Sequence, residues 1–234
     1  MTPFIAELTG TAVLITLGSG VVANVLLDKT KGNNSGLIVI ALAWAIAVFV
    51  GVYISADTSG AHLNPAVTIG LAVAGKFSWA LVPSYLLAQV MGAFIGAVLA
   101  WLTYKDHYDE TKDPALLLAT FSTGPAIRRP FSNLMTETIA TFVFMLSIFF
   151  IQKGEVKLGA LDALPVSLLV LGVGLSMGGP TGYAINPARD LGPRIAHALL
   201  PIPHKGGSDW KYAPIPVVGP VLGAVLAALL YNWL

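Results

Sequence analysis

The sequence predicts an all-α membrane protein, with six transmembrane helices and two re-entrant half-helices arranged as an inverted repeat. Composition is the first reason, because 56% of the residues are apolar and only 11% are charged, whereas a soluble domain carries about a quarter charged residues. The second reason is a set of six apolar segments near the length that a bilayer requires. The third is a pair of Asn-Pro-Ala triplets, each opening an apolar segment too short to cross.

Composition also excludes several classes of function. The formal net charge is +1, and no basic cluster suggests a nucleic-acid surface. The chain has no cysteine, which excludes disulfides and thiolate metal sites. The first apolar run exceeds signal-peptide length and has no basic segment before it, so we expect a retained helix.

The six predicted spans are separated by turn residues and charges. A helix needs roughly 20 apolar residues to cross a hydrocarbon core of about 30 Å. The longest connection, Thr103–Ser132, carries charges of both signs and three prolines, so we expect a solvated loop between two halves of about 1–108 and 130–234. The spans run approximately over Phe4–Leu27, Leu37–Ile54, Ser78–Leu102, Asn133–Ile151, Leu161–Met177 and Tyr212–Trp233.

Two further apolar segments, Pro65–Gly75 and Pro187–Leu200, are too short to span. Eleven helical residues reach about 16 Å, which is half a bilayer. Each segment follows an asparagine, which is a good N-cap, and begins with a proline, which is favoured at the first helical position. Irregular backbone at membrane depth is tolerated where it is buried or lines a water-filled cavity. The two segments therefore predict half-helices beside a cavity.

The two halves of the chain resemble each other. Glu7 within Ala6–Thr11 aligns with Glu137 within Thr136–Thr141, and the residues before the two triplets align as well. Each half has three spans, an odd number, so the second half enters the membrane from the opposite face. Such inverted repeats place broken helices near the midplane.

Paired Asn-Pro-Ala triplets at matching positions of an inverted repeat are a specific signal, whereas a lone triplet usually marks an ordinary helix start. With their flanks, Ser-Gly-Ala-His-Leu and Asn-Pro-Ala-Arg-Asp, they make nearly the whole chain resemble the aquaporin and aquaglyceroporin family. The resemblance implies the aquaporin fold, a homotetramer in a lipid bilayer, and a passive pore for water, glycerol and other small neutral solutes. It implies no cofactor.

The triplets indicate how such a pore works. With its side-chain oxygen engaged as a cap, each asparagine can point amide N–H groups into the lumen. The two half-helix N-termini each put about half a positive charge at the midplane, which disfavours cations and protons. The resemblance adds a ladder of backbone carbonyls before each asparagine. The triplets are Asn64, Pro65 and Ala66, and Asn186, Pro187 and Ala188; the ladder is Gly60, Ala61, His62 and Leu63, and Gly182, Tyr183, Ala184 and Ile185.

Arg189 lies inside the second half-helix, where an arginine is costly and usually faces a water-filled cavity. The alternative is a structural ion pair with Asp190. The resemblance assigns Arg189 to a selectivity filter with Trp44, Gly174 and Tyr183. The two aromatic rings would contact the carbons of a polyol while its hydroxyls bond to the guanidinium. Water-selective relatives typically have histidine where Gly174 stands, and glycine there is expected to leave room for a larger solute.

Three neighbouring residues complete this part of the sequence. Asp190 is the family's other mark of glycerol conductors, and the resemblance implies that it holds the half-helix and a loop in place. Tyr183 departs from the pattern, because many glycerol facilitators carry phenylalanine there, and its hydroxyl leaves the water-to-glycerol ratio open. Pro193 is expected to deprive the Arg189 carbonyl of its helical partner and to bend the half-helix.

Glu7 and Glu137 are acids inside predicted spans, and they occupy equivalent positions in the repeat. They could carry protons in a coupled transporter, or accept hydrogen bonds from backbone N–H groups of the re-entrant loops. The family pattern favours the second role. His62 has no second ligand at metal spacing, so no metal site is predicted.

Orientation and assembly are less determined. Lys76, Lys153 and Lys157 lie on the side of both termini and the other ten basic residues lie opposite, so counting Lys and Arg places the termini outside. The resemblance places them in the cytoplasm, which we adopt because several opposing basic residues lie in the re-entrant loop or beside acids. Small residues, Gly92-Ala93 with Gly96-Ala97 and Gly219 with Gly223-Ala224, permit close helix contacts within or between subunits.

Three functional hypotheses result. The favoured one is passive conduction of glycerol, water and other small neutral solutes across a cell membrane, including undissociated lactic acid, dihydroxyacetone and urea, with ions and protons excluded. The second is a narrower water channel, against which Gly174 and Asp190 argue. The third is an ion-coupled transporter that uses Glu7 and Glu137. No nucleophile–base pair or metal cluster supports an enzyme.

Overall fold

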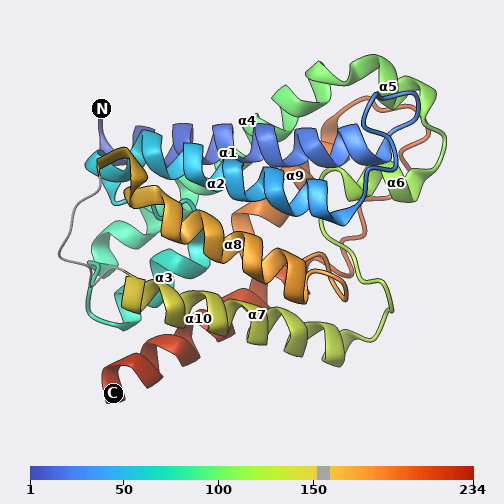
Figure 1. The fold of residues 1–234 in the computed structure, drawn as a ribbon. Helices are drawn as coiled ribbons and strands as arrows, with labels where there is room; N and C mark the ends of the chain where they lie inside the picture. The colour runs from blue at the N-terminus through green and yellow to red at the C-terminus, as the bar shows by residue number, and fades with distance from the viewer. Residues whose placement is uncertain (152–158) are drawn as a thin grey trace.

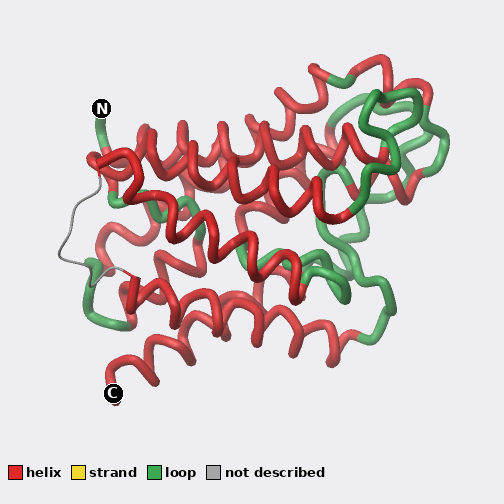
Figure 2. The backbone as a smooth tube through the Cα atoms, in the orientation of Figure 1, coloured by secondary structure: helices red, strands yellow, loops and turns green. Residues whose placement is uncertain are grey.

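The computed structural model describes residues 1–151 and 159–234, and over these ranges the protein is helical and without strands (Figures 1 and 2). Lys153 and Lys157, which enter the charge count, lie outside the described residues. The long helices are α1 (Pro3–Leu26), α2 (Leu37–Ser59), α4 (Val82–Thr103), α7 (Pro130–Ile151), α8 (Leu164–Met177) and α10 (Pro214–Trp233). Short 3₁₀ turns, Trp79–Leu81 and Gly159–Ala163, precede α4 and α8.

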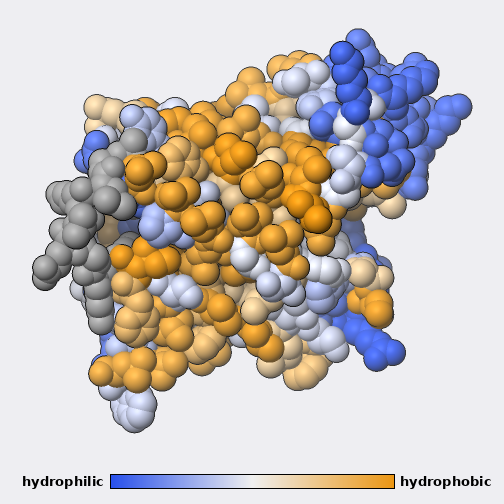
Figure 3. All heavy atoms as spheres, in the orientation of Figure 1, coloured by the Kyte–Doolittle hydropathy of each residue, from blue (hydrophilic) through white to orange (hydrophobic). Residues whose placement is uncertain are grey.

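Five of the long helices have the length and apolar character to cross a membrane, and the segment of α8, Leu161–Met177, is shorter. Their outer faces are apolar: on α2, Ile38, Leu42 and Ile46 are 71%, 50% and 53% exposed. Exposed apolar area on this scale belongs in lipid. Figure 3 shows it covering the middle of the molecule. The predicted all-α membrane fold is confirmed.

The predicted second span ends too early. The sequence ends it at Ile54, where polar residues begin, but α2 continues to Ser59. Its last turn is polar and still inside the protein, because Ser55 donates to the Gly51 carbonyl at 2.5 Å and Ser59 donates to Glu7 at 2.6 Å. Hydrogen bonds of this kind offset the cost of burying hydroxyl groups.

The helices pack in two equivalent sets. In the first set α1 packs on α2 and α4, and in the second α7 packs on α8 and α10. The half-helices are α3 (Pro65–Val73), which packs on α10, and α9 (Pro187–Leu199), which packs on α4. Each half-helix therefore lies against the last long helix of the other set. Both chain ends lie at one end of the bundle in Figure 1, as six spans require.

Glycines set the closest helix contacts. A Cβ built on Gly92 of α4 would lie 2.3 Å from the Leu8 carbonyl of α1, and one built on Gly223 of α10 would lie 2.3 Å from the Thr138 carbonyl of α7. No side chain fits at such distances. The sequence leaves these small residues open to packing within or between subunits, and the structure shows that these two glycines pack within the chain.

The connection between the halves differs from the predicted solvated loop. It contains two short helices, α5 (Lys105–Glu110) and α6 (Pro114–Ala119), at the hydrophilic end of the molecule (Figures 1 and 3). Tyr108, Leu117 and Phe121 are almost completely buried in a core shared with α1 and α4. These three apolar side chains, which the charges and prolines around them obscure in the sequence, anchor the connection onto the bundle.

Candidate functional site: a pore through the bundle

The two Asn-Pro-Ala triplets begin the half-helices as predicted. Asn64 Oδ1 accepts from the backbone N–H of Ala66 at 2.8 Å, and Asn186 Oδ1 accepts from those of Ala188 and Arg189 at 3.0 and 3.2 Å. Both asparagines are extended, with φ of −157° and −146°. Each helix therefore begins abruptly at its asparagine cap.

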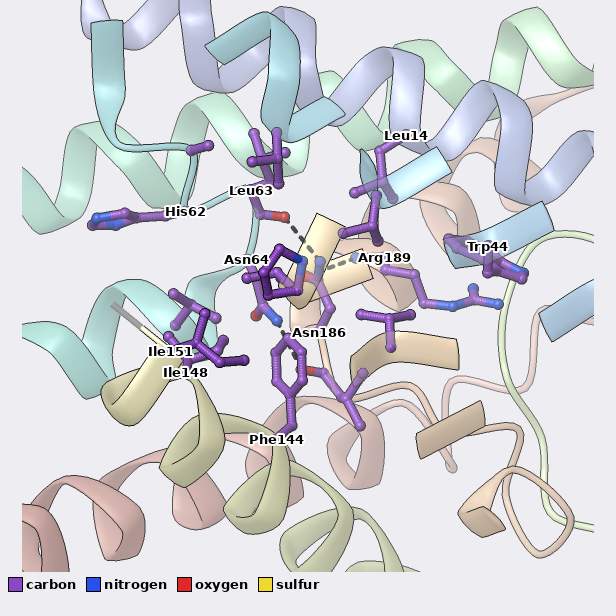
Figure 4. A pocket seen from close by; sticks show the side chains of 18 of the residues that line it. Leu14, Trp44, His62, Leu63, Asn64, Phe144, Ile148, Ile151, Asn186 and Arg189 are labelled. Carbon is purple, nitrogen blue, oxygen red and sulfur yellow. Dashed lines mark hydrogen bonds between the residues drawn. The ribbon is translucent and has the colours of Figure 1, made fainter. Parts of the chain in front are cut away.

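The asparagines also join the two half-helices. Asn64 Nδ2 donates to the Ile185 carbonyl and Asn186 Nδ2 to the Leu63 carbonyl, both at 2.9 Å (Figure 4). Each amide has two N–H groups, so one crosses to the other half and one remains for the lumen. The crossing bonds refine the expected ladder, because the carbonyls of Leu63 and Ile185 each already accept one hydrogen bond.

The backbone before each asparagine is irregular in the same way in both halves. Ala61 and Leu63 have φ of 51° and 52°, and Tyr183 and Ile185, at the equivalent positions, have φ of 39° and 42°. Positive φ costs a residue with a side chain roughly 1–3 kcal/mol and persists only where the surroundings enforce it.

Glu7 enforces the first loop. Its carboxylate accepts from the backbone N–H groups of His62 at 2.9 Å and Leu63 at 2.7 Å, and from the Ser59 hydroxyl and Gln89 amide at 2.6 and 2.8 Å. Glu7 is completely buried. Gln89 was missed in the sequence, although a glutamine inside a predicted span is a signal that could have identified it.

Glu137 does the same for the second loop. It accepts from the backbone N–H groups of Ala184 and Ile185, both at 3.0 Å, and from the Thr181 hydroxyl at 2.6 Å. Both acids thus have the hydrogen bonds that a loop-supporting role requires. These contacts leave the acids fixed on the protein side of the loops.

His62 is held by its neighbours. Its Nδ1 lies 3.1 Å from the Thr68 hydroxyl, and its ring packs on Phe77 and Tyr85 at centroid distances of 4.6 and 4.9 Å. Within residues 1–151 and 159–234, no group of three His, Cys, Asp or Glu side chains could hold a metal ion.

Arg189 and Trp44 meet at one end of the cavity. The Arg189 guanidinium carbon lies 4.4 Å from the centroid of the Trp44 ring, and Nη1 donates to the Phe121 carbonyl at 3.2 Å. Figure 4 shows the two side chains together, with His62 on the other side of the asparagines. Both are more than nine-tenths buried, and both line the cavity.

The alternative ion pair between Arg189 and Asp190 is not formed between these two described residues. Asp190 instead pairs with Arg194 one turn later, Oδ1 to Nε at 2.8 Å, with both side chains fully buried. Asp190 Oδ2 also accepts from the N–H and the hydroxyl of Thr123 at 2.8 and 2.7 Å. Arg194, which the sequence reading missed, donates to the Thr123 and Ser208 carbonyls as well.

Pro193 lies within α9, which continues through it to Leu199. The helix therefore does not end at this proline.

The space beside Gly174 is filled, which corrects the expectation that this glycine leaves room for solute. A Cβ built on Gly174 would lie 2.9 Å from Tyr183 Cζ and 3.1 Å from its hydroxyl oxygen. Gly174 does not line the cavity, whereas Tyr183 does. The glycine accommodates the tyrosine ring. The Tyr183 hydroxyl is buried there without a hydrogen-bond partner in the described part of the chain.

The two loops before the asparagines lie beside a cavity of about 480 Å³. All the predicted ladder residues except Gly182 contribute to it, together with Asn64, Asn186, Trp44 and Arg189. The rest of the wall is mainly apolar, which sequence periodicity alone could not assign to a lumen. That wall includes Leu14, Val48, Val52, Val67, Leu71, Phe144, Ile148, Ile151, Val166 and Val170. The cavity thus combines a strip of polar groups with an apolar surface.

Comparison with known proteins shows which family the chain resembles. Residues 1–231 match the family model described as Major intrinsic protein. A probable glycerol uptake facilitator protein of Thermotoga maritima is 55% identical over 234 residues, covering 100% of both chains. A glycerol uptake facilitator protein of Streptococcus pneumoniae is 54% identical over 232 residues, covering 99% of each. The crystal structure of the aquaglyceroporin from Plasmodium falciparum superposes with a TM-score of 0.88 at 34% identity, covering 98% of this chain and 94% of that one.

Proposed function

The chain belongs to the major intrinsic protein family and is a membrane channel for glycerol, and we propose that Trp44, Tyr183 and Arg189 select its solutes. The observation that carries this proposal is the arrangement of the Arg189 guanidinium over the Trp44 ring in a cavity that combines a strip of polar groups with a mainly apolar wall. Glycerol matches these two surfaces, because its carbons lie along one edge of the molecule and its hydroxyls along the other.

The filter acts by replacing hydration on one side of the solute. Glycerol carbons contact the rings of Trp44 and Tyr183, while its hydroxyls accept from Arg189 and donate to loop carbonyls. A buried polar group left without a partner costs roughly 1–3 kcal/mol. A solute without hydroxyls or an equivalent polar edge therefore leaves the remaining N–H groups of Arg189 without partners and passes less readily.

The two asparagines at the centre of the lumen exclude protons and cations. The free N–H of Asn64 and that of Asn186 donate to a passing oxygen, so that oxygen cannot also accept a proton from its neighbour. The positive ends of α3 and α9 face the same point and raise the energy of a cation there. Water, undissociated lactic acid, dihydroxyacetone and urea meet the same conditions.

The two alternative functions have less support. A narrow water-selective pore would need a side chain such as histidine at Gly174, and the Tyr183 ring already occupies that space. An ion-coupled transporter would need Glu7 and Glu137 to reach the solute, and their carboxylates are engaged by the loops. Neither alternative uses the contact between Trp44 and Arg189.

We further propose a homotetramer in the cytoplasmic membrane with both termini in the cytoplasm. Both chain ends lie at the same end of the bundle (Figure 1). The exposed apolar faces of the helices are available to lipid and to neighbouring subunits. The proposed function needs no cofactor, metal, catalytic residue or nucleic-acid partner, and the relatives are named glycerol uptake facilitators.

Light scattering from liposomes that contain the purified protein tests the function. Under opposed gradients of water and glycerol, glycerol should enter these liposomes faster than protein-free liposomes. Its rate of entry should be proportional to its concentration. Collapsing proton and sodium gradients with ionophores should leave that rate unchanged. Entry no faster than in protein-free liposomes would refute glycerol conduction, and saturable entry abolished by ionophores would favour the transporter.

A further inference from the structure

Both aromatic side chains of the filter lie against glycines of neighbouring helices. A Cβ built on Gly18 of α1 would lie 2.4 Å from two carbons of the six-membered ring of Trp44 and 2.6 Å from a third. A Cβ built on Gly178, just after α8, would lie 2.6 Å from Tyr183 Cδ1. Non-bonded carbon atoms do not approach each other this closely, so each ring occupies the space that a methyl group on the glycine would need.

Glycines close to Gly18 and Gly178 in the sequence lack such a contact. Among the described residues, a Cβ on Gly20, also on α1, would have only Tyr104 within reach, at 3.9 Å, and one on Gly179 would have nothing within 4 Å. The Cβ of Gly178 would also approach the Gly174 carbonyl, at 2.4 Å, so a change there would disturb backbone as well as ring. The three atoms nearest to a Cβ at Gly18 all belong to the Trp44 side chain, so Gly18 is the better position at which to test the effect on the filter.

We propose that Gly18 is a positioning residue that sets the width of the filter by fixing the Trp44 ring. The proposal rests on the proposed function of that filter. Gly18 lies against the edge of the ring and Arg189 lies over its face. Trp44 is buried apart from the surface that lines the cavity, so a methyl group at position 18 displaces the ring into the lumen.

Gly18→Ala tests this, with Gly20→Ala as the matched control on the same helix. Water and glycerol permeabilities are measured in liposomes with equal amounts of reconstituted protein. Gly18→Ala should lower the glycerol-to-water ratio about tenfold, because the larger solute loses more from a narrowed filter and overpacking is poorly tolerated. Gly20→Ala should match the unmodified protein. Equal ratios in the two variants would overturn the proposal.

A second pair of variants separates the ring from general helix packing. Trp44→Phe removes the ring edge that Gly18 contacts, so adding Gly18→Ala to it should leave the ratio of Trp44→Phe unchanged. A further fall in that background would show that the methyl group acts on α1 packing and would refute the role in positioning. If Gly18→Ala alone does not fold, recovery of folding by Trp44→Phe supports the proposal, and failure of both variants refutes it.

Failure of the proposed function gives a different result. In that case the unmodified protein does not conduct glycerol at all, and the effect of Gly18→Ala is read from water permeability against Gly20→Ala. Normal glycerol conduction with no effect of Gly18→Ala refutes the positioning role alone.

Discussion

At the scale of single residues, the Tyr183 hydroxyl is a buried polar group that we expect not to contact the solute. It lies beside Gly174 without a hydrogen-bond partner among the described residues, and the ring alone faces the cavity. Tyr183→Phe should therefore keep the glycerol-to-water ratio within about twofold, and raise the free energy of unfolding by up to about 1 kcal/mol because an unpaired buried hydroxyl is removed. Stopped-flow scattering and denaturant titration measure the two effects. A large change in the ratio would mean that the hydroxyl contacts the solute.

The contact between Gly174 and Tyr183 also predicts which filter changes can succeed. Gly174→His with Trp44→Phe should misfold or lose activity, because the new side chain collides with the tyrosine ring. Adding Tyr183→Ser clears the space, and the triple variant should shift toward water permeation. A stable double variant with an unchanged glycerol-to-water ratio would show that the filter lies elsewhere.

Replacing Glu7 with glutamine should lower the stability of the protein. In Glu7→Gln, an NH₂ group replaces one of the two carboxylate oxygens. Both oxygens accept from backbone N–H groups of the first loop, so one of these groups would then face another donor. We expect the free energy of unfolding to fall by about 1–3 kcal/mol. Glu110→Gln, at an exposed ion pair with Lys29, is the control and should have little effect. Unfolding in detergent micelles measures both, and equal stabilities would contradict the structural role.

At the scale of helices, the closest approach of α1 and α4 depends on Gly92. Gly92→Ala places a methyl group 2.3 Å from the Leu8 carbonyl, which is backbone and cannot rotate away. The variant should lose about 1–3 kcal/mol or more of stability. Gly172→Ala on α8, where nothing lies within 4 Å, should be neutral or stabilising because alanine favours a helix. A denaturation series in micelles compares them, and equal effects would count against tight packing at Gly92.

The ends of the helices could be predicted from the sequence where neighbouring residues determine them. The Asn-Pro starts of α3 and α9 followed from capping and from the backbone of proline. The last turn of α2 was missed because its polarity is satisfied by Glu7, a partner more than fifty residues away. Arg194 pairs with Asp190 one turn away, but its other partners, the Thr123 and Ser208 carbonyls, lie in two separate loops that the sequence does not bring together.

At the scale of the whole molecule, the inverted repeat followed from the sequence because two motifs and two acids recur in register. The hydrogen bonds that cross from Asn64 to Ile185 and from Asn186 to Leu63 depend on how the halves dock. The apolar wall of the lumen could not be predicted, because Val48 of the wall and Leu42 of the outer face are chemically alike. Only the packed bundle distinguishes them.

Glycerol is expected to cross the protein through the cavity between the two half-helices. The chain has no native cysteine, so a single cysteine can be placed at Val48, which lines the cavity, or at Leu42, which is 50% exposed on the outer face of the same helix. Glycerol flux into liposomes is then measured before and after a bulky thiol reagent. We predict that the reagent lowers the glycerol flux through Val48→Cys to that of protein-free liposomes and leaves the flux through Leu42→Cys unchanged. Unchanged flux through a fully labelled Val48→Cys protein would contradict the account.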